Sequence, residues 1–234
     1  MNTNISVMID LQKIWDEMSA FQSEAGRHEK SVAHWRERAK KSAGDIEELR
    51  GEIKKLNARM KERELELADC EAQIKKLDAR RGLLKTEKEL GALEHELALQ
   101  QGKKGEAEEE LINAMDRLES LEQELAAKTA ENESIQSQAK DDIAMLEGKI
   151  ADCRDKAAAL QERFDGRLND LQADLRSKFR KIISAKEGKA IALLDDNTCG
   201  VCHTSIPVQM AIEASRNDKI MNCTNCGRFL YGRL

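Results

Sequence analysis

Proline and aromatic residues are scarce in this chain of 234 residues. It contains a single proline, Pro207, and aromatic side chains make up only 3% of the residues. Globular domains of this length usually carry several prolines and bury aromatic rings, which contribute much of the apolar area of a core. The scarcity of both therefore argues against one compact globular domain.

Long apolar runs and a strong net charge are also missing. No stretch approaches the roughly 18 consecutive apolar residues that a membrane-spanning helix needs. The beginning, MNTNISVMIDLQKIWDEM, lacks a basic segment followed by a continuous apolar one, so we expect no signal peptide and a cytoplasmic location. The formal net charge of −5 gives the whole chain no basic character that would indicate a nucleic-acid-binding protein.

Charged residues make up 35% of the sequence, and the apolar residues between them follow a seven-residue repeat. From Val7 to Leu84, positions spaced alternately four and three residues apart are nearly all apolar. Such a repeat places these side chains in one stripe, here called the seam, and favours a coiled coil with another helix. The polar exceptions are His28, Ser42, Arg63 and Arg81. The pattern predicts one long helix over residues 7–84.

A second helix is predicted after a start signal at Thr86. Thr86 and Glu89 form a capping-box pattern, in which the hydroxyl accepts from a backbone amide and the glutamate reaches back. The apolar stripe resumes at Leu90 and, after two four-residue shifts, continues to Phe179. Four-residue shifts of this kind are stutters in a coiled coil. We therefore expect a helix over residues 86–184.

The two helices are expected to form an antiparallel coiled-coil hairpin with its turn near residues 82–86 and Val7 near Phe164. A turn near Gly102 and Gly105 is the alternative. The apolar stripe continues in register beyond these glycines, which favours the earlier turn. A hairpin can complete its seam within one chain, but two chains can also pair, so a monomer and a homodimer both remain open.

Four of the six cysteines form two Cys-x-x-Cys pairs near the C-terminus. The pairs are Cys199 with Cys202 and Cys223 with Cys226. Two thiolate pairs with this spacing can surround one tetrahedral zinc ion, and four thiolates leave no position for water. The pattern predicts one structural Zn²⁺ in a small zinc ribbon, while a thioredoxin-like redox pair and a four-thiolate iron site remain alternatives.

The predicted domains are a hairpin over residues 1–186 and a ribbon over residues 187–234. Short apolar runs around the cysteine pairs, at 189–194, 203–206, 220–222 and 228–232, are expected to be strands. Cys70 and Cys153 fall on seam positions, where we expect them to act as small apolar side chains.

Three segments together resemble a known family. They are LKTEKELGALEHEL at 84–97, CGVCHTSIPVQ at 199–209 and NCTNCGRFLY at 222–231. On these segments the chain resembles the bacterial family of coiled-coil proteins with a C-terminal C4-type zinc ribbon. It departs from the family pattern at Val208 and at Thr224-Asn225, where the family commonly has proline. The resemblance implies a long hairpin with the ribbon at its open end.

The resemblance also implies a non-enzymatic role. Relatives in this family are adaptors or chaperone-like regulators that engage an alternative sigma factor and flagellar or type III secretion components, and some are linked to RNA. We therefore predict a protein-binding adaptor or scaffold. Trp15 and Phe179, at the open end of the hairpin, are the candidate partner-binding residues.

A basic stretch before the ribbon supports a second interpretation, binding of nucleic acid, including RNA. Cations in this stretch could contact phosphates, and nearby aromatic rings could stack on bases. The candidate residues are Arg176, Lys178, Arg180, Lys181, Arg228 and Tyr231. Catalysis is not expected, because the sequence shows no nucleophile with a base beside it and no glycine-rich phosphate loop.

Overall fold

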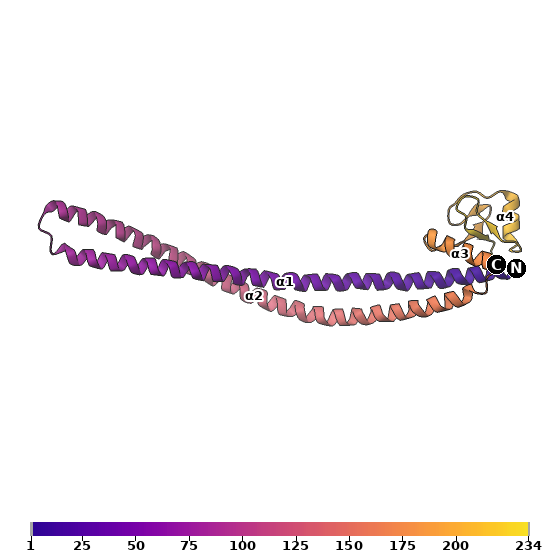
Figure 1. Ribbon diagram of the computed structural model, residues 1–234, viewed down its shortest axis with the longest axis horizontal. Helices are drawn as coiled ribbons and strands as arrows, with labels where there is room; N and C mark the ends of the chain where they lie inside the picture. The colour runs from indigo at the N-terminus through magenta and orange to yellow at the C-terminus, as the bar shows by residue number, and fades with distance from the viewer. Residues whose placement is uncertain (1, 234) are drawn as a thin grey trace. The chain divides into compact units, whose positions relative to one another are not determined.

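A computed structural model describes residues 2–233 (Figure 1). The elements, in chain order, are α1 (Thr3–Arg81), α2 (Glu87–Leu168), α3 (Ala173–Ala185), β1 (Ile191–Asp195), β2 (Thr198–Cys199), α4 (Val208–Ser215), β3 (Met221–Asn222) and β4 (Phe229–Tyr231). None of the helices within residues 2–233 contains a stretch that is apolar enough to cross a lipid bilayer.

Packing divides the chain into two units. The terminal unit comprises the chain up to Ala33 and from Asp142 onward, and the middle unit comprises His34–Asp141. The composition of the sequence places a boundary at residue 187, whereas packing groups the ribbon with the adjoining parts of α1 and α2. The boundary at residue 187 therefore stays a prediction.

In the middle unit, α1 and α2 run antiparallel. Ion pairs join Arg81 to Glu94 at 3.0 Å and Lys104 to Glu71 at 2.9 Å, so numbering rises along one helix as it falls along the other. Its buried apolar residues all lie on the predicted seam; they are Ile46, Cys70, Leu77, Leu93, Ala107, Leu121, Ile135 and Ala139. The stripe read from the sequence is therefore the surface along which these helices pack.

The turn between the two helices occupies residues 82–86. At its end, the Glu89 amide donates to Thr86 Oγ1 at 3.4 Å, and the Thr86 hydroxyl donates to the Glu89 carboxylate at 2.5 Å. These contacts supply partners at a helix start, where backbone amides have none within the helix. Gly102 and Gly105 lie inside α2, so the alternative position for the turn is wrong.

In the terminal unit, the predicted second helix is interrupted. It was expected to continue to residue 184, but α2 ends at Leu168 and α3 begins at Ala173. Asn169 and Asp170 favour this break because their short polar side chains compete for backbone hydrogen bonds. The last four-residue shift in the apolar pattern thus marks an interruption of the helix and not a stutter. The break lets α3 pack its apolar face against α1 and the ribbon.

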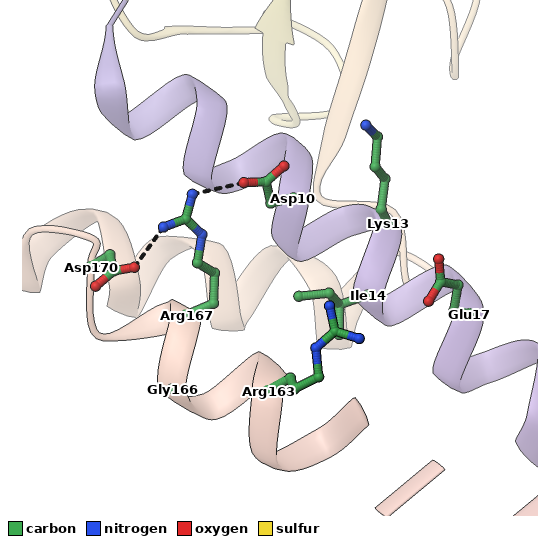
Figure 2. Close-up of a pocket in the computed structure, with 8 residues that line it drawn as sticks. All are labelled: Asp10, Lys13, Ile14, Glu17, Arg163, Gly166, Arg167 and Asp170. Atoms are coloured by element: carbon green, nitrogen blue, oxygen red, sulfur yellow. Dashed lines mark hydrogen bonds and ion pairs between the residues drawn. The ribbon is translucent and has the colours of Figure 1, made fainter. Parts of the chain in front are cut away.

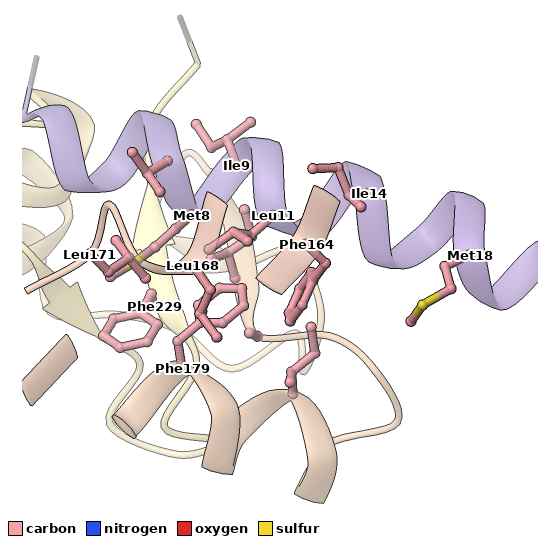
Figure 3. Close-up of a cluster of buried hydrophobic side chains, with 14 of the residues drawn as sticks. Met8, Ile9, Leu11, Ile14, Met18, Phe164, Leu168, Leu171, Phe179 and Phe229 are labelled. Carbon is pink, nitrogen blue, oxygen red and sulfur yellow. The ribbon is translucent and has the colours of Figure 1, made fainter. Parts of the chain in front are cut away.

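Four aromatic rings lie in or against the core of the terminal unit, and Figure 3 labels Phe164, Phe179 and Phe229 among them. The Trp15 and Phe164 centroids lie 5.5 Å apart, and Phe164 and Phe179 lie 6.4 Å apart. Phe179 also stacks on Phe229 at 6.4 Å. The rings come in turn from α1, α2, α3 and β4, so each of these elements contributes to one buried cluster. Val7 is in the same cluster as Phe164, as the hairpin predicts.

The first turns of α1 also pack in this core. These turns carry apolar residues that lie off the predicted seam. Ile5, Met8 and Ile9 are buried in the cluster that includes residues of α3 and β4. The contact is therefore made within the chain, and these side chains do not require a second molecule to cover them.

The ribbon contains a four-stranded sheet in the order β2-β1-β4-β3. β1 pairs antiparallel with β2 and parallel with β4, and β3 pairs antiparallel with β4. Residues 203–206 were expected to be a strand but contribute only an isolated bridge from Ser205 to Thr198. The tight turn after the first cysteine pair leaves that segment too short for a ladder.

Gln12 connects α1 to the start of the ribbon. Its side-chain amide donates to the Gly188 carbonyl at 2.7 Å, and its oxygen accepts from the Ala190 amide at 2.8 Å. Gly188 has φ +77°, and a Cβ at this position would overlap the indole of Trp15. Glycine is therefore required by the backbone conformation and by the close approach of Trp15.

Candidate metal centre

The structure brings the four predicted ligands together. The Sγ atoms of Cys199 and Cys226 lie 3.9 Å apart, and those of Cys202 and Cys223 lie 3.6 Å apart. All four sulfurs lie within 4.8 Å of one another. A tetrahedral zinc ion with Zn–S bonds of ~2.3 Å requires sulfur–sulfur distances of about 3.8 Å. The cluster therefore has the dimensions of a four-thiolate zinc site.

Two similar turns hold the cysteine pairs. Cys199 ends β2, and Cys223 directly follows β3. In the first turn the His203 amide donates to the Cys199 carbonyl at 2.8 Å, and in the second the Gly227 amide donates to the Cys223 carbonyl at 2.9 Å. Both donor residues have positive φ, +58° at His203 and +75° at Gly227. Both residues therefore adopt the left-handed conformation, which glycine takes readily, and the His203 side chain is exposed.

The environments of the sulfurs differ. Burial raises the pKa of the Cys199 thiol to about 12 and also raises the pKa of the Cys223 thiol. A hydrogen bond with the Thr204 hydroxyl lowers the pKa of Cys202 to about 5. Buried thiolates are unstable without a nearby positive charge, and zinc supplies that charge while releasing the thiol protons. The donor set thus fits a divalent cation that binds thiolates.

The chemistry of the site is structural. Four protein ligands complete the tetrahedral coordination shell of zinc, so no position remains for a substrate or an activated water. The ion would instead connect the turn after β2 to the turn after β3. A small domain gains folding free energy from such a bond, because the unfolded chain has no preformed site.

Comparison with known proteins agrees with this geometry. Residues 198–230 match the family model described as a C4-type zinc ribbon domain. The chain is thus a mostly helical protein with an antiparallel coiled-coil hairpin and a C-terminal C4-type zinc ribbon that holds one structural zinc ion. The search of curated proteins found no match.

Three solved structures share the fold. The structure of CT398 from Chlamydia trachomatis has a TM-score of 0.88 at 18% identity, with 97% of each chain covered. The HP0958 protein from Helicobacter pylori has a TM-score of 0.70 at 17% identity, with coverage of 99% of this chain and 98% of that one. A protein from Mycobacterium smegmatis has a TM-score of 0.60 at 20% identity over 100% of both chains. At these identities the likeness concerns the fold alone.

The basic stretch before the ribbon is partly engaged in internal contacts. Arg176 donates to the carbonyls of Asn169 and Leu171, at 2.9 and 3.1 Å, and so supplies partners in the break after α2. Arg180 pairs with Asp165 at 3.4 Å. Lys178 and Lys181 are exposed on α3. Both arginines thus make intramolecular contacts while Arg180 is exposed and Arg176 is half-buried, so the nucleic-acid contacts predicted for these two arginines and for the two lysines stay predictions.

Arg228 is a buried structural residue, with only 8% of its surface exposed. Its guanidinium donates to the Lys189 carbonyl at 2.8 Å and to the Lys186 carbonyl at 3.1 Å. The prediction that Arg228 contacts nucleic acid is therefore wrong. These hydrogen bonds connect the residue that precedes β4 to the segment between α3 and β1. The planar guanidinium, which carries several N–H donors, can reach both carbonyls at once.

Replacing Arg228 by lysine is expected to lower the free energy of unfolding of the zinc-loaded ribbon by about 2 kcal/mol, because a buried hydrogen bond from a charged group is lost while the charge is kept. Urea unfolding in excess zinc measures this change. The matched control is Arg233→Lys, since the side chain of Arg233 is 79% exposed and its ion pair with Asp195 is on the surface. Equal stability of the two variants would contradict the structural role of Arg228.

The aromatic candidates are core residues to different degrees. Phe179 is completely buried, so the prediction that it contacts a partner is wrong; its ring is needed to fill the core. Trp15 is half-buried against Phe164, and its role as a partner contact stays a prediction. Tyr231 is half-buried in β4, and burial raises the pKa of its hydroxyl. Its role in nucleic-acid binding also stays a prediction.

A charged pocket of about 480 Å³ lies between α1 and the end of α2 in the terminal unit (Figure 2). Arg167, which lines it, pairs with Asp10 at 2.7 Å and with Asp170 at 2.8 Å. Three further charged side chains, Lys13, Glu17 and Arg163, line it. Cations and carboxylates are balanced in number, so the pocket favours neither an anion nor a cation. Sequence analysis missed it because its residues come from two distant segments.

Proposed function

We propose that this protein is a non-enzymatic adaptor that binds other proteins along its helices, with the zinc ribbon as a structural part. The middle unit supports this proposal most directly. Its buried apolar residues all lie on the seam between two helices, so that the rest of each helix faces outward. A two-helix unit of this kind offers extended surface for contacts with other proteins.

Two exposed apolar side chains of that surface lie three residues apart on α2. Ile112 and Met115 lie off the seam on α2 with 61% and 59% of their surfaces exposed. Residues three apart on a helix are neighbours, so these two side chains form one patch, here called the 112/115 pair. Covering it with an apolar surface of a partner would release water from both faces. The 112/115 pair is the feature that we expect a partner protein to contact.

The family resemblance extends the proposal to a chaperone-like regulator. On that basis the partners would be an alternative sigma factor or flagellar or type III secretion components. Nucleic acid, including RNA, is the alternative partner, and the exposed Lys178 and Lys181 on α3 are the residues that would contact it. The two classes of partner respond differently to nuclease and to salt, because phosphate contacts weaken steeply as salt rises.

The proposal is tested by affinity capture from an extract of the cells that produce the protein, using zinc-loaded bait with and without nuclease. An adaptor should retain a defined protein after nuclease treatment and at moderate salt. The captured protein is then purified and titrated against the bait by calorimetry. Binding that disappears with nuclease, or recovery of nucleic acid alone, would overturn the adaptor proposal and favour the alternative.

Variants connect the captured protein to the surface. The double variant Ile112→Gln/Met115→Gln should weaken binding at least ~10-fold, since two contact side chains are replaced by polar ones. Met145→Gln is the matched control, because Met145 is 52% exposed on the same helix but lies in the terminal unit. Circular dichroism checks that both variants keep the helices. Equal binding by the double variant and the control would show that the 112/115 pair is not the contact.

A further inference from the structure

The four zinc ligands differ in how well packing protects them. Cys199 and Cys223 are buried, at 0% and 3% exposure, whereas Cys202 and Cys226 are only half-buried. A buried ligand is held in place by the surrounding apolar side chains. A half-buried ligand depends more on polar neighbours, because the surrounding solvent does not restrain it.

Cys202 has such polar neighbours, and they come from both turns of the ribbon. The Thr204 hydroxyl lies 3.5 Å from Cys202 Sγ. The Asn225 side-chain amide, from the turn that contains the second cysteine pair, donates to Thr204 Oγ1 at 2.8 Å. The contact therefore runs from Asn225 through Thr204 to the ligand sulfur and crosses between the two turns.

The direction of the proton in this contact follows from the chemistry of the ligand. A cysteine that binds zinc does so as a thiolate, which has no proton to donate. The Thr204 hydroxyl must then donate to Cys202 Sγ. Because the Asn225 amide occupies an acceptor position on the same oxygen, it restrains the rotation of Thr204 and leaves the hydroxyl proton available for the sulfur.

We propose that Thr204, held by Asn225, is a positioning residue for the zinc ligand Cys202. Its hydrogen bond fixes the sulfur at the zinc site and stabilises the thiolate over the thiol, and both effects favour zinc binding. The same bond withdraws electron density from the sulfur, so the bound thiolate reacts more slowly with electrophiles. Contacts of this kind around a metal ligand contribute to affinity although they do not touch the metal.

Cys226 provides an internal comparison. Cys202 and Cys226 are the second members of their pairs and are both half-buried. The residue two positions after Cys202 is Thr204, whereas the residue two positions after Cys226 is Arg228, whose guanidinium donates to backbone carbonyls outside the turn. Loss of the Thr204 hydroxyl should therefore affect Cys202 and leave Cys226 unchanged.

The first test measures zinc affinity of the full chain by competition with a chromophoric chelator. Thr204→Val, which keeps the shape and removes the hydroxyl, should weaken zinc binding about 10-fold. Thr204→Ser restores a hydroxyl and should bind nearly as tightly as the native chain. Thr224→Val is the matched control, since Thr224 is an exposed threonine of the second turn, and it should not change affinity. Equal affinities of Thr204→Val and Thr224→Val would overturn the proposal.

A double-mutant cycle tests the part played by Asn225. If Asn225 acts through Thr204, Asn225→Ala should weaken zinc binding in the native background and have no further effect in the Thr204→Val background. If the two replacements instead lower zinc affinity additively, the two side chains act separately. This result would overturn the proposal that Asn225 acts through Thr204.

The reactivity of each cysteine gives a readout that general loosening of the ribbon would not produce. Zinc-saturated protein is treated with iodoacetamide, and alkylation is followed at each site by mass spectrometry. The thiolate sulfur attacks the CH₂ carbon, a C–S bond forms and iodide leaves. In Thr204→Val, alkylation should be faster at Cys202 than in the native chain and unchanged at Cys226. Equal acceleration at all four ligands would show a loss of ribbon stability and would overturn the positioning role.

Discussion

Replacement of Cys199 by serine is expected to unfold the ribbon and to abolish zinc binding. Cys199 is completely buried and contributes one of the four sulfurs of the cluster. Zinc binding at such sites is linked to roughly 10–16 kcal/mol of apparent folding free energy at neutral pH, and most of it is lost with one ligand. The zinc content measured by mass spectrometry should fall from one ion per chain to none.

Loss of the ribbon should also loosen the first turns of α1, because Ile5, Met8 and Ile9 pack in the same cluster as Phe229. Hydrogen exchange followed by mass spectrometry should show faster exchange in β1, β4 and the beginning of α1. The helices of the middle unit should keep their protection, since their seam is completed within that unit. If the ribbon amides of the Cys199→Ser variant stay protected from hydrogen exchange, the structural role of zinc is contradicted.

The control for this experiment is Cys153→Ser. Cys153 is buried in the seam and is not a zinc ligand, so its replacement should leave the zinc content at one ion. Chelation of zinc from the native chain should reproduce the exchange pattern of the Cys199 variant. A different pattern would indicate that the serine itself, and not the loss of zinc, perturbs the ribbon.

Replacement of Phe179 by alanine should lower the free energy of unfolding of the terminal unit by about 3–5 kcal/mol, the range for large cavities left by buried aromatic residues. The Phe179 ring lies at 6.4 Å from both Phe164 and Phe229, so its loss separates α3 from α2 and from β4. Urea unfolding followed by Trp15 fluorescence, in a Trp35→Phe background, reports on this unit alone. The middle unit, which holds position 35, should unfold as before.

Phe21→Ala is the matched control for this prediction. Phe21 is half-buried at the edge of the same core, with Lys156 above its ring at 5.5 Å. Removal of the Phe21 ring leaves a site that is open to solvent. It should lower the free energy of unfolding of the terminal unit by less than half as much as the loss of the Phe179 ring. Similar costs for the two variants would mean that the aromatic core is not the main contribution to the stability of this unit.

Much of the fold could be read from the sequence because the signals are local. The seven-residue repeat located the seam, and most of its positions are buried or half-buried in the structure. The spacing of Cys199, Cys202, Cys223 and Cys226 predicted a zinc ribbon because the chemistry of zinc fixes both the ligand type and the short spacer. These features depend on residues that are near one another along the chain.

The roles of Phe179 and Arg228 were misread for one common reason. An apolar or cationic side chain near the end of a predicted helix has the same local pattern whether it faces solvent or the core. The break after Leu168 turns α3 back onto α1 and buries Phe179, and the same packing directs Arg228 to carbonyls of the linking segment. No short-range pattern reports such contacts.

The sequence by itself determined that the chain forms a coiled-coil hairpin and a four-cysteine zinc site, because helical periodicity and metal-ligand spacing are properties of short segments. The tertiary structure decided how the beginning of α1, α3 and the ribbon join in one core. It also decided that Asn225 reaches Thr204 beside Cys202, a contact between residues 21 positions apart. Burial and hydrogen bonding across such separations depend on the folded backbone, which alone brings these side chains together.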